Sequence, residues 1–179
     1  SIQLNASGGL RIRSATAIAG GLAVTTGGDL LIDAGSATGN IALTSDGGTI
    51  SVGTLTDGAE IRLRSNDIVI AGNGQLGTIG KTTLVDLTNN GRGRTFVGGN
   101  GGNGGYDLSA TELARIFSGD IFIHAPLAGG QGAESVGSTR APDVVVGSFT
   151  LSSRASNSNG NLAADGTFGI DTPGKLRVV

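Results

Sequence analysis

Pairs of aliphatic residues, with one residue between the two members, recur through the first 71 residues with a period near twenty. One series of pairs begins at Ile2, Leu22, Ile41 and Ile61, and a second series begins at Leu10, Leu30, Ile50 and Ile68. Two aliphatics separated by one residue lie on the same face of a strand. A fixed period of this length, with strand-sized apolar units between glycine-containing corners, is typical of stacked β-coils. We therefore predict an all-β, right-handed parallel β-helix (a β-solenoid) with about 20 residues per coil, its hand following the usual chirality of parallel crossovers.

Glycine pairs precede the second series at matched positions, namely Gly8–Gly9, Gly27–Gly28 and Gly47–Gly48. Because glycine adopts positive φ without steric cost, these pairs predict a tight corner that is repeated in each coil. The residues between the paired aliphatics should face solvent. A weaker set formed by Ile18, Leu55 and Leu76 predicts a third face and a triangular cross-section.

The chain divides into regular coils over residues 1–88, a Gly/Asn-rich loop over 89–105 and less regular coils over 106–179, within one continuous solenoid. Ser109 and Glu112 match a capping box, which predicts one short helix near residues 109–118 that Gly119 ends. We expect Ile79 to point inward, and strands at 144–146, at 149–151 and around Phe168, Ile170, Leu176 and Val178. Because neither end carries a polar cap over its open coil, the sequence predicts a fragment of a longer repeat protein.

The composition excludes several classes of function. The net charge is −2 and charged residues make up only 15% of the chain, which gives no electrostatic basis for binding nucleic acid or an anionic membrane. There is no cysteine, so disulfides and thiolate metal sites are excluded. No apolar run approaches the roughly 20 residues of a membrane-spanning helix.

Parallel β-helices include polysaccharide lyases and hydrolases, so a catalytic carboxylate pair has to be considered. Asp29 and Asp33 flank one strand, but one coil earlier their places hold Gly9 and Arg13. His124 is the only histidine, which makes it a poor catalytic or metal candidate. The segment from Gly101 to Leu108 resembles a calcium-binding nonapeptide in a single copy, with its aspartate one residue late. We therefore predict no enzyme activity, no catalytic, cofactor-binding or metal-ligating residues and no cofactor.

Two stretches carry a resemblance to a known family. GGDLLIDAGSATGNIALTSDGGTI resembles the coil repeats of filamentous-haemagglutinin-type exoproteins, which bacterial two-partner systems secrete, and LSATELARI…DIFIHAP is similar to a segment set between such coils. The resemblance implies a large extracellular β-helical adhesin or filament that is exported through an outer-membrane β-barrel partner.

The expected function is accordingly that of a non-enzymatic structural or adhesive solenoid, extracellular or on the bacterial cell surface. Its expected partners are a surface glycan or protein of a host or neighbouring cell, the flanking coils of the same long chain and, end to end, further copies of itself, with no nucleic acid. Loops at 91–105 and 129–142 would present contacts. The alternative is a polysaccharide-active or carbohydrate-binding β-helix, for which a groove with convergent carboxylates and an arginine would be the sign.

Overall fold

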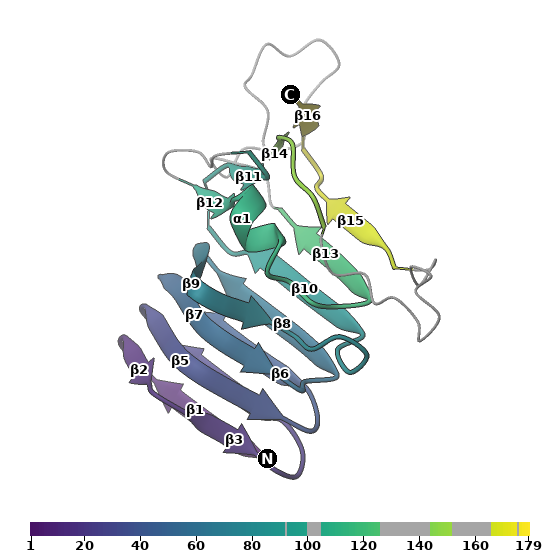
Figure 1. Cartoon of the computed structure of the whole chain (residues 1–179). Coiled ribbons are helices and arrows are strands. Elements are labelled where there is room, and N and C mark those ends of the chain that lie inside the picture. The colour runs from purple at the N-terminus through teal and green to yellow at the C-terminus, as the bar shows by residue number, and fades with distance from the viewer. Residues whose placement is uncertain (92, 100–104, 126–143, 152–165, 175) are drawn as a thin grey trace.

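Three all-parallel sheets stack strands that lie about one coil apart in the sequence, which makes the chain a parallel β-helix (Figure 1). This computed structural model describes residues 1–91, 93–99, 105–125, 144–151, 166–174 and 176–179. Where the structure describes the chain, no helix is long and apolar enough to cross a membrane.

The first sheet runs through the whole stack. Its strands, in spatial order, are β1 (Ile2–Ala6), β4 (Leu22–Thr26), β6 (Ile41–Ser45), β8 (Glu60–Ser65), β10 (Leu84–Asn89), β13 (Asp120–His124) and β15 (Phe168–Asp171). The spatial order equals the chain order, so each coil adds one strand to this sheet.

The second sheet holds the predicted second series of aliphatics. Its strands are β2 (Leu10–Ile12), β5 (Leu30–Ala37), β7 (Thr49–Thr56) and β9 (Asp67–Leu76), and β3 (Ala15–Ala17) pairs with the far half of β5. The third sheet orders β12 (Tyr106–Leu108), β11 (Thr95–Val97), β14 (Val144–Val146) and β16 (Leu176–Val178).

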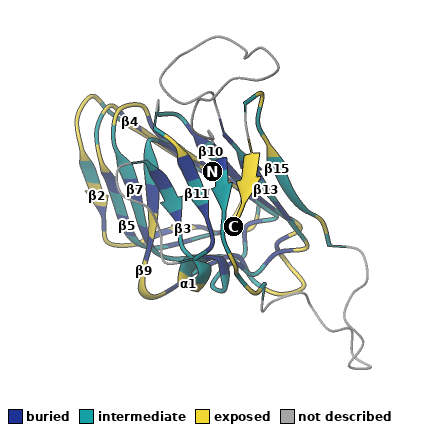
Figure 2. Cartoon of the chain, turned by 90° about the horizontal axis from the view of Figure 1, so that it is seen from above, coloured by how far each residue is buried: buried dark blue, intermediate teal, exposed yellow. Residues whose placement is uncertain are grey.

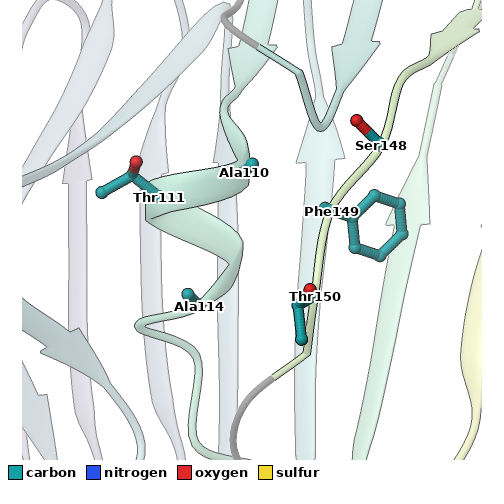
Figure 3. A pocket seen from close by; sticks show the side chains of 6 residues that line it. All are labelled: Ala110, Thr111, Ala114, Ser148, Phe149 and Thr150. Atoms are coloured by element: carbon teal, nitrogen blue, oxygen red, sulfur yellow. The ribbon is translucent and has the colours of Figure 1, made fainter.

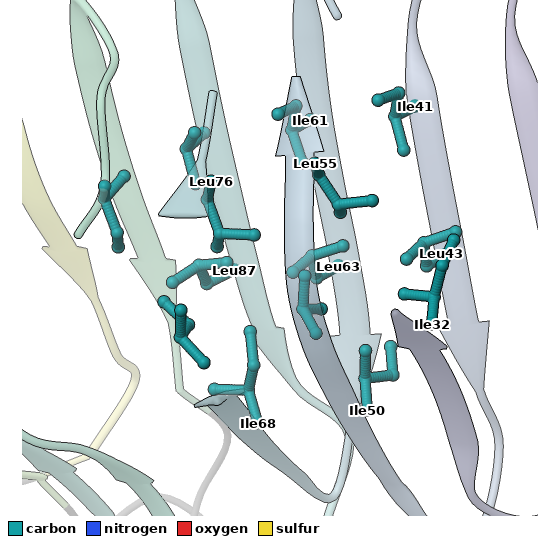
Figure 4. Packing of buried hydrophobic residues seen from close by; sticks show 14 of the residues in the cluster. Ile32, Ile41, Leu43, Ile50, Leu55, Ile61, Leu63, Ile68, Leu76 and Leu87 are labelled. Carbon is teal, nitrogen blue, oxygen red and sulfur yellow. The ribbon is translucent and has the colours of Figure 1, made fainter. Parts of the chain in front are cut away.

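The predicted register is confirmed. Leu22 pairs with Ile2 on one side and with Ile41 on the other, and Ile41 pairs with Ile61. Leu22 is 1% exposed and Ile41 is fully buried, whereas the alternate residue Ala42 is exposed. Burying one such aliphatic side chain contributes about 1.5–3 kcal/mol, so the ladder of equivalent residues stabilises every coil it crosses. Figure 4 shows part of this ladder, with Ile41 and Ile61 among the buried side chains that it labels. Figure 2 shows the buried positions recurring along the strands.

A buried polar row accompanies the aliphatic ladder where the first sheet ends. Thr26, Ser45 and Ser65 are fully buried. The hydroxyls of Thr26 and Ser45 donate to the carbonyl of Gly28, at 2.7 and 2.8 Å, and Ser65 donates to the carbonyl of Asp67 at 2.6 Å. These bonds give each buried hydroxyl a partner, so burying the hydroxyls is not costly.

The corner glycines occur where predicted, but the conformational reason was wrong. Positive φ is found at Gly20, Gly72, Gly77, Gly80, Gly98 and Gly99 among the described glycines, and none of these belongs to the three corner pairs. At Gly27 and Gly48 the requirement is close approach instead. A Cβ at Gly27 would collide with the carbonyl oxygen of Ser7 in the preceding coil, and one at Gly48 would collide with Asp29.

The predicted third face of the cross-section exists, but some of the residues that line it differ from those predicted. This face is distinct from the third sheet. It is formed where β5, β7 and β9 turn a corner, and its inward row runs from Ala15 through Gly35 and Leu55 to Leu76. A Cβ at Gly35 would meet Leu55 at 2.7 Å, so the glycine makes room for the larger neighbour. Ile18 is 85% exposed and Ile79 is 52% exposed, so both were wrongly assigned to the interior.

The predicted helix exists but is shorter. α1 spans Ala110–Leu113, and both halves of the capping box between Ser109 and Glu112 are formed. The helix ends before Gly119 because Ile116 forms a parallel bridge with Leu76 and continues the third face. Residues 144–146 form the expected strand. Residues 149–151, which were also expected to form a strand, have no regular secondary structure.

The Ile41→Asp substitution tests the register. An unpaired carboxylate would enter an apolar ladder at a fully buried position, so we expect the free energy of unfolding to fall by at least about 3 kcal/mol. Ala42→Asp is the matched control, because its side chain is exposed, and it should change stability by less than about 0.5 kcal/mol. Urea denaturation followed by circular dichroism measures both, and equal losses would contradict the assigned faces.

Gly27→Ala tests close approach between coils. The added methyl group meets the backbone of Ser7, so the coils must shift and we expect a loss of about 1–3 kcal/mol. Gly8→Ala is the control, since nothing lies within 4 Å of a Cβ there. That variant should be neutral or gain up to about 1 kcal/mol through the unfolded state. The same denaturation experiment compares the two, and a neutral Gly27→Ala would show that the corner is not constrained by its neighbour.

Candidate functional site

Outward-facing charged side chains pair both between coils and within one strand. Arg11 pairs with Asp33 of the next coil at 3.1 Å, whereas Arg62 pairs with Glu60 of its own strand, β8, at 2.8 Å. Arg64 donates to the side-chain oxygen of Asn90 at 2.9 Å. The arginine side chains in both ion pairs are well exposed. Exposed pairs contribute about 0–1 kcal/mol each, so these two add little to the stability of the fold.

Among the described residues, the carboxylates do not form a metal centre. Over the residues that the structure describes, no group of three or more His, Asp or Glu side chains could hold a metal ion. Asp29, one of the two carboxylates considered for catalysis, accepts a hydrogen bond from the backbone N–H of Thr49 at 2.9 Å, one coil further on. Residues 101–104 of the calcium-like segment lie outside the described residues, and Tyr106, within the same segment, is fully buried in β12.

His124 lies between two aspartates that the sequence alone did not connect to it. Its Nε2 is 3.4 Å from Asp86 Oδ1, and its Nδ1 is 3.4 Å from Asp171 Oδ2. The three residues belong to β10, β13 and β15, which are neighbours in the first sheet. Because each ring nitrogen faces a carboxylate, the arrangement differs from a nucleophile–imidazole–carboxylate triad. The signal that could have found it is the alternation in DIFIH and FGID, once the coils are aligned.

A second set of polar residues fills the junction between the second and third sheets. The strands of the third sheet do not follow the chain order. β12 comes after β11 in the chain, but it lies at the end of the sheet and packs beside β9. Glu112 Oε1 accepts from the N–H of Ile70 at 3.0 Å, and Arg115 donates to the carbonyl of Ile70 at 2.8 Å. Asp67 Oδ1 accepts from the N–H of Asp107 at 2.9 Å. Side chains therefore pair with backbone groups at the edge of β9, where a neighbouring strand would pair with them in a regular coil.

Burial dominates the electrostatics of this junction. Desolvation raises the pKa of the Asp67 carboxyl, against the opposing effect of hydrogen bonds from the Asp107 and Ile68 backbone, and the nearby charges of Asp107 and Glu112 raise it further. Burial also raises the pKa of the Tyr106 hydroxyl far above its ordinary value. That hydroxyl has no hydrogen-bond partner. Desolvation therefore opposes ionisation at this junction, where Tyr106 is fully buried and Asp67 is partly buried.

A shallow hollow of about 540 Å³ lies between α1 and residues 148–150 (Figure 3). It is lined by Ala110, Thr111, Ala114, Ser148, Phe149 and Thr150. None of these six described side chains carries a charge, and the hydroxyls of Thr111, Ser148 and Thr150 are the polar groups that they contribute. The carboxylate pair that glycoside hydrolysis requires is not among them.

Comparisons of the chain with protein-family models, with curated proteins and with solved structures find no match. The architecture and the side-chain geometry are therefore the basis for a functional assignment.

Asp67→Asn tests the effect of burial on the ionisation of Asp67. Because the folded-state pKa lies above the unfolded value, the native state binds the proton more tightly than the unfolded state does. The free energy of unfolding therefore falls as pH rises from the unfolded pKa through the folded pKa. The asparagine removes the charge and keeps an oxygen that can accept from the N–H of Asp107. We expect a higher melting temperature than wild type at pH 7, and an advantage that shrinks below pH about 4, near the unfolded pKa.

The control for this prediction is Asp46→Asn, which removes one negative charge from an exposed corner. Thermal denaturation across the pH range should show a much smaller effect there. An advantage for Asp67→Asn that grows on acidification would contradict the assignment of desolvation as the dominant cause.

Proposed function

We propose that this chain is a non-enzymatic structural or adhesive β-solenoid, a segment of a large secreted bacterial surface adhesin or filament of the filamentous-haemagglutinin type. The observation that supports this most strongly is the uninterrupted first sheet, whose seven strands follow the chain order from β1 to β15. The resemblance of the coil repeats to that family adds the extracellular setting and export through an outer-membrane β-barrel partner.

Such a molecule works by geometry. Hydrogen bonds between parallel strands run along the stack, and the buried ladder inside it resists bending, so the coils form a stiff support. The outward positions between the aliphatics hold small or polar residues over the first coils, for instance Gln3, Ala23 and Ala42 in one row. Contacts to a surface glycan or protein would be made by side chains that this support presents at fixed spacing.

Continuation of the stack is part of the proposal. Parallel strands at the first and last coil present backbone groups that another coil can pair with, from the same long chain or from another copy. In β1, Leu4 is 38% exposed, and in β16, Leu176 is 47% exposed, which are positions whose equivalents inside the stack are buried.

A polysaccharide-active or carbohydrate-binding β-helix is the second candidate. The observation that favours it is the imidazole of His124 between two carboxylates on an outer face. Catalysis by carboxylates requires a bound sugar between an acid and a base. In this arrangement the imidazole already occupies the space between the two aspartates, which favours the non-enzymatic proposal.

Two assays on one preparation test the choice. Beads coated with the chain should adhere to cell surfaces more than albumin-coated beads do, and the soluble chain should release no new ends from acidic or neutral polysaccharides. Cleavage that is lost in His124→Ala would overturn the proposal in favour of the enzyme. Beads that adhere no better than albumin-coated beads would contradict the adhesive function.

A further inference from the structure

The last strand of the second sheet, β9, contains a bulge at one corner of the stack (Figure 1). β9 holds four residues, 71–74, where the paired strand β7 has only Gly53. The bulge includes Gly72 at φ +46° and ends at Gly74, where a Cβ would collide with the carbonyl oxygen of Gly53. Between the two glycines of the bulge, Asn73 is exposed. Its side chain therefore lies outside both the strand ladder and the packed interior.

The side-chain amide of Asn73 is unconstrained. Among the residues that the structure describes, none exchanges a hydrogen bond with it. The next residue is Gly74, which has no Cβ to hinder the approach of its backbone nitrogen to the amide carbon. The two reacting atoms belong to neighbouring residues, so the attack is intramolecular and needs no second molecule to be brought into place.

We propose that Asn73 is a site of spontaneous deamidation, which converts it into a mixture of aspartate and isoaspartate. The backbone nitrogen of Gly74 loses its proton and attacks Cγ of Asn73, which closes a succinimide ring. The bond from Cγ to Nδ2 breaks, and Nδ2 leaves as ammonia with the proton that the Gly74 nitrogen gave up. No atom changes its oxidation state, and no catalytic residue is required.

Water completes the reaction by opening the succinimide. If water cleaves the bond between Cγ and the Gly74 nitrogen, the product is aspartate in an ordinary main chain. If water cleaves the bond between the backbone carbonyl carbon of residue 73 and the same nitrogen, the product is isoaspartate, and the main chain then runs through Cγ. Both products carry one more negative charge than the unmodified chain.

Asn90 has the same neighbour in sequence, Gly91, but its amide is held in place. Its Oδ1 accepts from Nε and Nη2 of Arg64 at 3.2 and 2.9 Å, and its Nδ2 donates to the carbonyl of Asp46 at 3.2 Å. The attacking nitrogen is engaged as well, because the Gly91 N–H donates to Oδ1 of Asn89 at 2.8 Å. Ring closure at Asn90 must first break these bonds, so we expect it to be slower than at Asn73 by about tenfold or more.

The bulge lets the fold tolerate the product. Isoaspartate adds a methylene group to the main chain, which would shift the register if it lay within a paired stretch. Ile70 and Gln75 pair with β7 on either side of the bulge, so the extra length stays between them. We therefore expect the modified chain to remain folded, with a new carboxylate on the outer surface of this corner.

Ageing the purified chain in a mildly alkaline buffer tests the proposal. Trypsin cleavage after Arg64, Lys81 and Arg92 yields residues 65–81, which contain Asn73, and residues 82–92, which contain Asn90. Mass spectrometry follows the replacement of NH by O in each peptide, and fragment ions assign the change to one residue. The peptide 65–81 should gain this mass with time and become a substrate for an isoaspartyl methyltransferase, while the peptide 82–92 lags by about tenfold or more.

The chain unfolded in urea is the matched control. Both asparagines are then followed by an unconstrained glycine and should react at the same rate, so any difference in the folded chain comes from the structure. Asn73→Gln should abolish the change in the peptide 65–81, because a glutamine side chain is too long to close the succinimide ring. Arg64→Ala should raise the rate at Asn90 by up to about tenfold and leave the rate at Asn73 unchanged.

The folded chain decides the outcome without any variant. An Asn73 that stays intact in the folded chain, after both asparagines have reacted in urea, would overturn the proposal. Equal rates at Asn73 and Asn90 in the folded chain would overturn it too. The result is independent of the adhesive function, since beads that adhere while Asn73 stays intact would support that function and remove only this site.

Discussion

Contact between equivalent aliphatic side chains in successive coils is the interaction on which the rest of the structure depends. A single coil of about 20 residues cannot bury its own apolar side chains, because it has no layer above or below it. Leu22, for example, is buried with Ile2 and Ile41 as its neighbours in the adjacent coils. The stack therefore gains stability coil by coil, and each coil is constrained to the same register by its neighbours.

That register also fixes what the outer surface presents. Every inward aliphatic forces its strand neighbours outward, and every outward residue is aligned with equivalents in the adjacent coils. Asp86, His124 and Asp171 are 38 and 47 residues apart in sequence and become neighbours through this alignment alone. The length of the intervening chain has no influence on the spacing of the strands, so large insertions between coils leave the surface rows intact.

The break between the second and third sheets shows how the fold accommodates an irregular segment. The chain passes from β10 to β11, returns to place β12 beside β9, and then forms α1 before it rejoins the first sheet at β13. Glu112 and Arg115 bond to the backbone of Ile70, as the neighbouring strand would do in a regular coil. The first sheet continues through this level, and its continuity holds the two parts of the stack together.

The repeat in the sequence alone determined the coil length and the two series of inward aliphatics. The capping box at Ser109 could also be predicted, because it depends on residues that are close in the chain. The repeat missed the exposure of Ile18 and Ile79. It also assigned the corner glycines to positive φ, whereas Gly27 is needed because the carbonyl of Ser7 passes close by. Those features depend on the distance to the adjacent coil, which no local pattern encodes. The carboxylates around His124 and the ring of Phe122 over Gly169 were likewise decided by the tertiary structure, since only the lateral pairing of β10, β13 and β15 brings them together.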